Sequence, residues 1–353
     1  MKGALILADG TIIHGQGFGY ECESFGELVF NTSMMGYQEA LTDPSYAGQA
    51  LILTYPLVGN YGINKFDSES SKAHVRGFIL RSLSLDYSHR SSEKSLDQFL
   101  IEQKVPILSG VDTRFLVRHI REKGVMPCAV VTSKNEIDSK KILQKLHFDY
   151  SSEDFVSQVS PKSIKVYNKG AKKKVALLDF GAKGGIVDEL VKRNLEVHVF
   201  PSDSSSKQIL EIDPDGIMLS NGPGDPAILT YAHKTILELG GKVPIFGICL
   251  GNQLLSHAYG GDTFKLKFGH RGSNHAVLEL KTNKVSITTQ NHGFAVGKVP
   301  KGFDVTHINL NDKTVEGLEN KNLDIFSVQY HPEAKPGPHD STQLFDKFVK
   351  KFS

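Results

Sequence analysis

Tryptophan is absent from this sequence, and cysteine is scarce, with Cys22, Cys128 and Cys249 as its three members. Their number is odd and their spacing is scattered, unlike a disulfide framework or the paired cysteines of a zinc site. We therefore expect a protein of a reducing, cytoplasmic compartment, with no metal held by its cysteines and no metal in its catalytic site.

Long apolar runs and an excess of one charge are also lacking. No stretch approaches the roughly 18 apolar residues of a membrane helix, and the apolar opening is too short for a signal peptide because Asp9 interrupts it. The 41 basic and 39 acidic residues leave a formal charge of +2. Such a balance gives no electrostatic case for binding nucleic acid or a membrane.

The length is sufficient for two domains. The 353 residues exceed the roughly 150 that make up a typical domain. Residues 133–174 are rich in serine and lysine and end in a basic run, which is typical of a solvated linker. We place the boundary near residue 172, with an N-terminal domain and linker at 1–172 and a C-terminal domain at 173–353.

The N-terminal part is predicted to be rich in strands. Asp-Gly at residues 9–10 separates two apolar segments, which predicts a hairpin with a type I′ turn. Asp112 can cap a helix that follows it. The further elements expected here are strands at 27–30 and 50–54 and helices at 95–103 and 113–122.

The C-terminal part alternates apolar strands with helices, a pattern typical of an open α/β parallel sheet flanked by helices. The expected strands are at 175–180, 197–200, 216–219 and 243–246, and the helices at 185–193, 207–212 and 227–239. The later apolar runs at 276–280, 284–289, 305–310 and 324–329 look like an antiparallel extension. Ligands of such sheets bind at the carboxyl ends of the parallel strands.

Cys249 lies at one such end, at a sharp turn between a strand and a helix and between Gly247 and Gly251. This is the cysteine counterpart of a nucleophile elbow. A thiol at a helix N-terminus is favoured as thiolate, and the amide of Leu250 would face an oxyanion. A buried core cysteine is the alternative interpretation, so a nearby base decides between the two.

His331 and Glu333 supply a candidate base and its orienting carboxylate at the end of another strand. The imidazole can accept the thiol proton and return it to a leaving amine, while the carboxylate fixes the tautomer. Residues 220–226, Ser-Asn-Gly-Pro-Gly-Asp-Pro, end a third strand but lack the lysine of a phosphate-binding loop. A Cys-His-Glu triad is the interpretation that the sheet favours.

These motifs resemble those of class I glutamine amidotransferases. The segments that carry the resemblance are 220–226, 247–253 and 331–333. Other segments resemble the small subunits of carbamoyl-phosphate synthases, so the likeness extends over nearly the whole chain. They are Phe-Asn-Thr-Ser-Met-Met-Gly-Tyr-Gln-Glu at 30–39 together with 41–46, 54–64, 269–275, 290–294 and 336–340.

The resemblance implies a glutaminase subunit. Cys249 would attack the amide of L-glutamine and form a γ-glutamyl thioester, with His331 moving the proton. The matched oxyanion amides are those of Gly222 and Leu250. The positions that match the family's glutamine contacts are Ser45, Gly222, Gly224, Leu250, Gln253, Asn291, Gly293 and Phe294.

The resemblance also implies a heterodimer with a separate large subunit. That partner would use ammonia, ATP, bicarbonate and magnesium to make carbamoyl phosphate for arginine or pyrimidine synthesis, whereas this chain itself would need no cofactor. The chain ends at Ser353, so we expect the large subunit not to be fused to it.

The sequence departs from the family pattern at positions that concern the surroundings of the pocket and subunit docking, not the reaction. Gly184 and Gly185 stand where the family has other residues, Lys335 replaces a serine, and the segment 126–129 lacks a glycine. None affects the triad. The alternatives are a free-standing cysteine γ-glutamyl hydrolase, the amidotransferase subunit of another synthase, and a non-catalytic scaffold.

Overall fold

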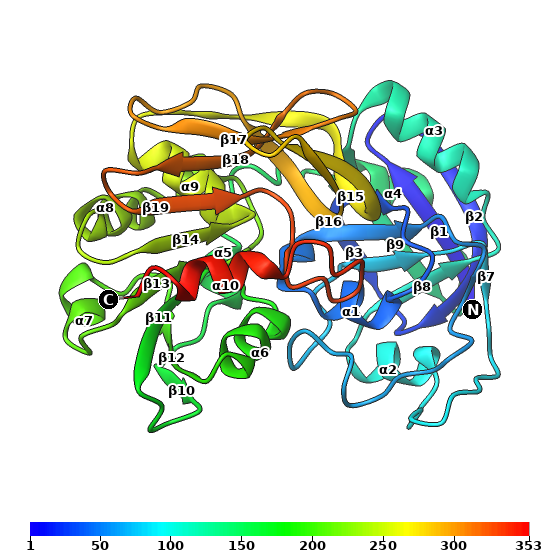
Figure 1. The fold of residues 1–353 in the computed structure, drawn as a ribbon. Coiled ribbons are helices and arrows are strands. Elements are labelled where there is room, and N and C mark those ends of the chain that lie inside the picture. Colours follow the sequence, from blue (N-terminus) through cyan, green and yellow to red (C-terminus); the bar gives the residue numbers. More distant parts are fainter. Residues whose placement is uncertain (353) are drawn as a thin grey trace. The chain divides into compact units, whose positions relative to one another are not determined.

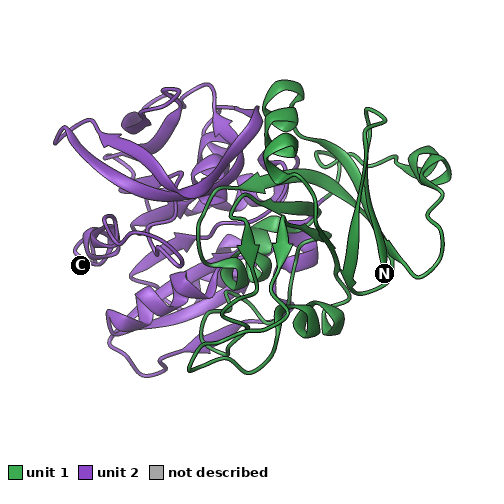
Figure 2. Cartoon of the chain, turned by 90° about the vertical axis from the view of Figure 1, so that its right-hand side faces the viewer, with its two compact units in different colours: residues 1–153 green, residues 154–353 purple. Residues whose placement is uncertain are grey.

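The computed structural model describes residues 1–352 and divides the chain into two compact units, Met1–Glu153 and Asp154–Ser353 (Figures 1 and 2). Both units combine helices with strands, which confirms the α/β class expected from the sequence. None of the helices within residues 1–352 has the length and apolar character needed to span a bilayer.

Unit 1 is built around a closed barrel of parallel and antiparallel strand pairs. In barrel order the strands are β1 (Lys2–Leu7), β2 (Ile12–Gly19), β8 (Pro106–Ser109), β6 (Gly77–Ile79), β4 (Gln49–Leu53), β3 (Glu23–Asn31) and β9 (Met126–Ser133). The helices are α1 (Tyr37–Thr42), α2 (Leu96–Glu102), α3 (Thr113–Lys123) and α4 (Ser139–Lys145), with a short η1 (Pro44–Tyr46) and the paired strands β5 (Leu57–Val58) and β7 (Ser82–Leu83).

Local signals in unit 1 are confirmed, with one correction. β1 and β2 form the predicted hairpin, and α2 and α3 begin after Ser95 and Asp112, whose side chains accept hydrogen bonds from helix amides. The type I′ turn is wrong, because such a turn needs positive φ at both central residues. Gly10 has φ 87°, whereas Asp9 is outside the positive region, and the connection closes through Leu7 and Thr11.

Unit 2 contains one ten-stranded sheet. In sheet order its strands are β10 (Lys165–Tyr167), β12 (Leu195–Pro201), β11 (Lys173–Asp179), β13 (Gly216–Leu219), β14 (Ile245–Ile248), β19 (Ile325–Val328), β18 (Val315–Asn320), β16 (Lys284–Val296), β15 (Thr263–Glu279) and β17 (Asp304–Asn309). The strands from β12 to β19 are parallel, and those from β18 to β17 are antiparallel to their neighbours (Figure 1).

Helices cover both faces of the parallel part of this sheet. Apolar side chains of α7 (Ser206–Leu210), α8 (Thr230–Leu239) and α9 (Leu250–Ala258) pack in one core cluster. Side chains of α6 (Gly184–Lys192) and α10 (Gln343–Val349) pack in a second cluster. Because each cluster includes alternate residues of the same strands, the two clusters lie on opposite faces. The predicted helix 227–239 is in fact a short η2 (Pro226–Ile228) followed by α8.

Two details differ from the sequence interpretation. Residues 324–329 were expected in the antiparallel extension, but β19 pairs in parallel with β14 and is antiparallel only to β18. Unit 2 also begins earlier than residue 172. Val156 of α5 (Val156–Val159) is part of its core, and β10 is an edge strand paired with β12, so the serine- and lysine-rich segment is not all linker.

Candidate active site

Cys249 stands between β14 and α9 in a backbone conformation that non-glycine residues rarely adopt, with φ 54° and ψ −102°. Glycine at position 251 permits this tight turn. A Cβ there would lie only 2.4 Å from the carbonyl oxygen of Leu219. The Cys249 amide donates to the Val328 carbonyl at 2.9 Å, which fastens the turn to β19. The nucleophile elbow expected from the sequence is therefore formed.

The thiol of Cys249 is buried beside the strand β16. Its sulfur lies 3.7 Å from the carbonyl oxygen of Asn291. The unusual backbone conformation of Cys249 costs free energy, and such conformations persist where the surrounding structure holds the residue in place. The elbow thus presents the sulfur at the carboxyl end of β14, where the fold is expected to bind its ligand.

His331 and Glu333, the predicted base and its orienting carboxylate, form a buried pair. His331 Nδ1 lies 2.7 Å from Glu333 Oε1, and both side chains are buried. His331 Nε2 makes no hydrogen bond to an oxygen or nitrogen atom within residues 1–352, so it is available to the thiol. Burial lowers the pKa of His331, but the charges of Glu333 and Cys249 outweigh it and raise that pKa to about 10. The imidazole is thus a strong proton acceptor next to the sulfur.

Lys183 is a site residue to which the sequence interpretation gave no role. Its Nζ lies 3.0 Å from Glu333 Oε1 and donates to the Lys335 carbonyl at 2.6 Å, with the side chain almost fully buried. Burial raises the pKa of Glu333, while the charges of Lys183 and His331 outweigh it and lower that pKa to about 2. Lys183 therefore keeps the orienting carboxylate ionised. Lys183 lies four residues after the end of β11 and directly before α6, and no local pattern marks it as a site residue.

The loop after β13 lies against the elbow. A Cβ on Gly222 would meet the Phe180 carbonyl oxygen at 2.2 Å and the Leu250 side chain at 2.8 Å, so only glycine fits there. Leu250 is the first residue of α9, and its amide has no acceptor within the helix. The amides of Gly222 and Leu250 thus come from neighbouring segments, as an oxyanion site requires. Gly224 has φ 92° in the same loop.

The other predicted glutamine contacts in unit 2 lie on α9 and β16. Gln253 donates from Nε2 to the Phe294 carbonyl at 2.8 Å and to Gln329 Oε1 at 3.2 Å. Asn291, Gly293 and Phe294 lie close together in sequence on β16, and the carbonyl of Asn291 contacts the sulfur. Their role in binding glutamine stays a prediction.

Ser45 is the one predicted contact that belongs to unit 1. It lies in η1, where its amide donates to the Asp43 carboxylate at 2.9 Å. This cap fixes the backbone of the serine but does not by itself indicate a ligand. Its role in binding glutamine also stays a prediction.

Comparison with known proteins covers both units. Residues 176–351 match the family model "Glutamine amidotransferase class-I", and residues 5–130 match "Carbamoyl-phosphate synthase small chain, CPSase domain". Proteins named carbamoyl phosphate synthase small chain include one from Clostridium acetobutylicum, 47% identical over 352 residues, and one from Methanocaldococcus jannaschii, 51% identical over 357 residues, each with 99% of both chains covered. A pyrimidine-specific small chain of Bacillus subtilis is 48% identical over 351 residues, covering 99% of this chain and 96% of that protein.

Proposed function

This chain belongs to the carbamoyl-phosphate synthase small chain family, and from that premise we propose that it hydrolyses L-glutamine and supplies the ammonia to a large subunit. The single observation that carries the proposal is the triad, with Cys249 on its strained elbow and the His331–Glu333 pair in the same buried site. The similarity of residues 5–130 to the family's own N-terminal domain supports this family over other amidotransferases.

In the first half-reaction the sulfur of Cys249 attacks the side-chain carbonyl carbon of glutamine. His331 takes the thiol proton and passes it to the departing nitrogen, so that the carbon–nitrogen bond breaks and ammonia leaves. The amides of Gly222 and Leu250 face the oxyanion that forms in between. Glu333 holds the imidazole in the required tautomer and stabilises its charged form, and Lys183 fixes that carboxylate in turn.

In the second half-reaction water attacks the γ-glutamyl thioester. His331 now acts as the base that takes a proton from water and returns it to the sulfur as the carbon–sulfur bond breaks. Glutamate is released, and the Cys249 thiol is restored. The chemistry needs no cofactor in this chain, whereas ATP, bicarbonate and magnesium are expected in the large subunit that consumes the ammonia.

We expect a cytoplasmic heterodimer whose product serves pyrimidine or arginine synthesis. The name of the Bacillus subtilis relative supports the pyrimidine role by similarity. L-Glutamine and the large subunit are the two partners on which this proposal depends.

The test is to assay carbamoyl phosphate formation by the chain together with its large subunit. Cys249→Ser should abolish synthesis from glutamine and leave synthesis from added ammonia at the wild-type rate, because the thiol handles only the amide. Efficient glutamine use by the variant would contradict the triad.

A second arm separates the proposal from a free-standing γ-glutamyl hydrolase. Glutamine hydrolysis by the chain should rise when the large subunit, ATP and bicarbonate are added. Equal rates with and without them would favour the free-standing enzyme.

A further inference from the structure

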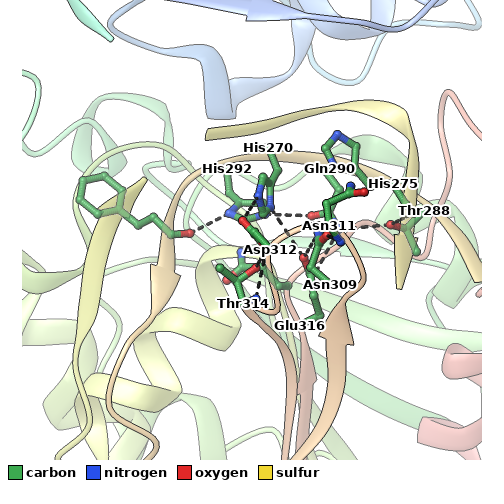
Figure 3. Close-up of polar contacts among 12 residues, drawn as sticks. His270, His275, Thr288, Gln290, His292, Asn309, Asn311, Asp312, Thr314 and Glu316 are labelled. Carbon is green, nitrogen blue, oxygen red and sulfur yellow. Dashed lines mark hydrogen bonds and ion pairs between the residues drawn. The ribbon is translucent and has the colours of Figure 1, made fainter. Parts of the chain in front are cut away.

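A second buried cluster of ionisable side chains lies in the antiparallel part of the unit 2 sheet. His270 on β15 and His292 on β16 are cross-strand partners, and Glu316 is on β18. All three residues are buried, and one potential ligand atom from each lies within 4.8 Å of the others. Figure 3 shows these side chains pointing toward one another. The glutaminase mechanism uses none of them.

Hydrogen bonds fix the tautomer of both imidazoles. His292 Nδ1 lies 2.7 Å from the Phe294 carbonyl oxygen, which can only accept, so this nitrogen carries a proton. His270 Nε2 lies 2.8 Å from the carboxylate of Asp312, so it too is a donor. Each neutral ring therefore presents its other nitrogen, Nε2 of His292 and Nδ1 of His270, as a lone pair. Metal-binding histidines are oriented by the same kind of partner.

Acceptor atoms then face one another without a proton between them. Thr288 donates its hydroxyl to the His275 carbonyl, so its oxygen must accept from Gln290 Nε2. That nitrogen also donates to Glu316, which turns Gln290 Oε1 toward His292 Nε2 at 2.9 Å. Two acceptors at this distance repel unless a cation joins them.

The lone pair of His270 has no hydrogen-bond partner either. Its Nδ1 is buried and lies 3.8 Å from Glu316 Oε1, which is too long for a hydrogen bond. That oxygen already accepts from Asn309 Nδ2 at 2.8 Å. The carboxylate is thus oriented by amides on both of its oxygens while facing two imidazoles (Figure 3).

Protons would satisfy both lone pairs only if both rings were charged. The ring centroids of His270 and His292 lie 4.9 Å apart in a buried site, so two imidazolium charges would repel each other there. One divalent cation satisfies both lone pairs at once.

We propose that His270 Nδ1, His292 Nε2 and a Glu316 carboxylate oxygen bind a divalent transition metal, with Gln290 Oε1 as a fourth ligand. Two nitrogens and two oxygens suit Zn²⁺. Ligand atoms roughly 2.1 Å from one ion lie about 3.0–3.4 Å apart, which the 2.9 Å separation already approaches. The ligand atoms of His270, His292 and Glu316 lie within 4.8 Å of one another, and side-chain rotation on metal binding would shorten these separations. Asp312, about two-fifths exposed, leads from the cluster to solvent.

The proposed metal is a positioning centre for the active-site strand. His292 directly follows Asn291, whose carbonyl oxygen lies next to the Cys249 sulfur. His292 and Gln253 both donate hydrogen bonds to the Phe294 carbonyl. A metal at His292 would fasten this segment of β16 to β15 and β18. Its effect on glutamine rests on the proposed function, and the binding of the metal does not.

The experiment measures Zn²⁺ binding by the full chain. Cys249→Ser is the background, because thiolates also bind zinc. Protein stripped with a chelator should take up one equivalent by elemental analysis, and its Tm should rise by about 5–10 °C at a Zn²⁺ concentration a hundredfold above Kd. When Co²⁺ replaces Zn²⁺ in the protein, the visible absorption spectrum should be that of Co²⁺ bound by two nitrogen ligands.

Variants assign the ion to this cluster. Asp312→Asn removes only the partner of a ligand and should weaken binding by about 10–100-fold. Glu316→Gln replaces the one anionic ligand by a neutral amide and should weaken binding more. The matched control is Glu196→Gln, which removes a carboxylate 2.7 Å from His198 on β12 and should leave binding unchanged.

Several results would overturn the proposal. They are no uptake of Zn²⁺, equal uptake by Glu316→Gln, or a Tm that does not respond. If Glu316→Gln fails to fold, the binding of Zn²⁺ by Asp312→Asn still tests the proposal, because the Asp312 side chain is partly exposed.

In the complete enzyme with its large subunit, metal removal should raise the KM for glutamine more than it lowers kcat. If the proposed function is wrong, only this effect on KM will be missing. The measured uptake of one equivalent of Zn²⁺ would still support the metal site.

Discussion

The Nζ atom of Lys183 lies 3.0 Å from Oε1 of Glu333, and both side chains are withdrawn from solvent. The same carboxylate oxygen lies 2.7 Å from His331 Nδ1. Glu333 thus stands between two cationic partners, one structural and one catalytic. The buried charge of Glu333 lowers the stability of the fold if either partner is lost.

Replacing Lys183 by methionine should damage both stability and catalysis. Loss of one partner of a buried ion pair costs about 3–5 kcal/mol, because the other charge is left unpaired. We expect urea unfolding to report a loss of that size and kcat for glutamine hydrolysis to fall, with the ammonia-dependent reaction of the complex unchanged. Lys192→Met removes an ion pair whose lysine is largely exposed, and is the matched control. Equal unfolding free energies for the two variants would contradict the role given to Lys183.

The contribution of the His331–Glu333 pair to stability should depend on pH in a defined direction. Glu333 has its pKa lowered from 4.5 to about 2, so its stabilisation is complete above 4.5 and is lost as pH falls through 2. His331 has its pKa raised from 6.5 to about 10, so its stabilisation is complete below 6.5 and is lost as pH rises through 10. Both contributions are complete only between about pH 4.5 and 6.5.

The measurement compares the unfolding free energy of wild type with that of His331→Asn across this range. The difference between them should be largest between about pH 4.5 and 6.5 and should shrink toward pH 10. A difference that instead grows with rising pH would show that the imidazole is destabilised, not stabilised, in its charged form.

Sequence and structure agree best where a local rule decides the outcome. The elbow at Cys249 is predictable because a cysteine framed by glycines, between a strand and a helix, is typical of a nucleophile at a tight turn. Caps at Ser95 and Asp112 are equally local signals, and both are formed. The pairing of Cys249 with His331 depends on recognising the parallel sheet, since 82 residues separate them and only the fold brings them together.

What the sequence does not reveal depends on contacts between distant segments. Lys183 meets Glu333 across 150 residues, and nothing in its local sequence indicates a buried lysine. His270, His292 and Glu316 come from three strands of the antiparallel extension, and β18 was not predicted. The closure of the unit 1 barrel likewise depends on pairs such as β1 with β9, which no local pattern encodes.

Ser45→Ala should raise the KM for glutamine. The serine matches a glutamine-contact position of the family, and a neutral hydrogen bond is worth about 0.5–1.5 kcal/mol, or roughly two- to tenfold in KM. Ser33→Ala, in the same unit but not at a position that matches the family's glutamine contacts, is the control. Steady-state kinetics of the complex give the answer, and an unchanged KM for Ser45→Ala would contradict a hydrogen bond between its hydroxyl and glutamine.

The strain at Cys249 can be measured by comparing two variants that both lack the sulfur. Cys249→Ala keeps a Cβ at φ 54° and ψ −102°, whereas Cys249→Gly removes it. Relief of such a conformation is worth about 1–3 kcal/mol, from which about 0.5–1 kcal/mol is lost because glycine is more flexible in the unfolded chain.

We therefore expect Cys249→Gly to unfold at a higher urea concentration than Cys249→Ala, by up to about 2.5 kcal/mol in free energy. Neither variant should hydrolyse glutamine. The matched comparison is Cys128→Gly against Cys128→Ala, at a buried strand position with ordinary φ, where glycine should be the less stable of the two. If alanine is the more stable residue at both positions, the elbow stores no strain, and the sulfur owes its position to packing alone.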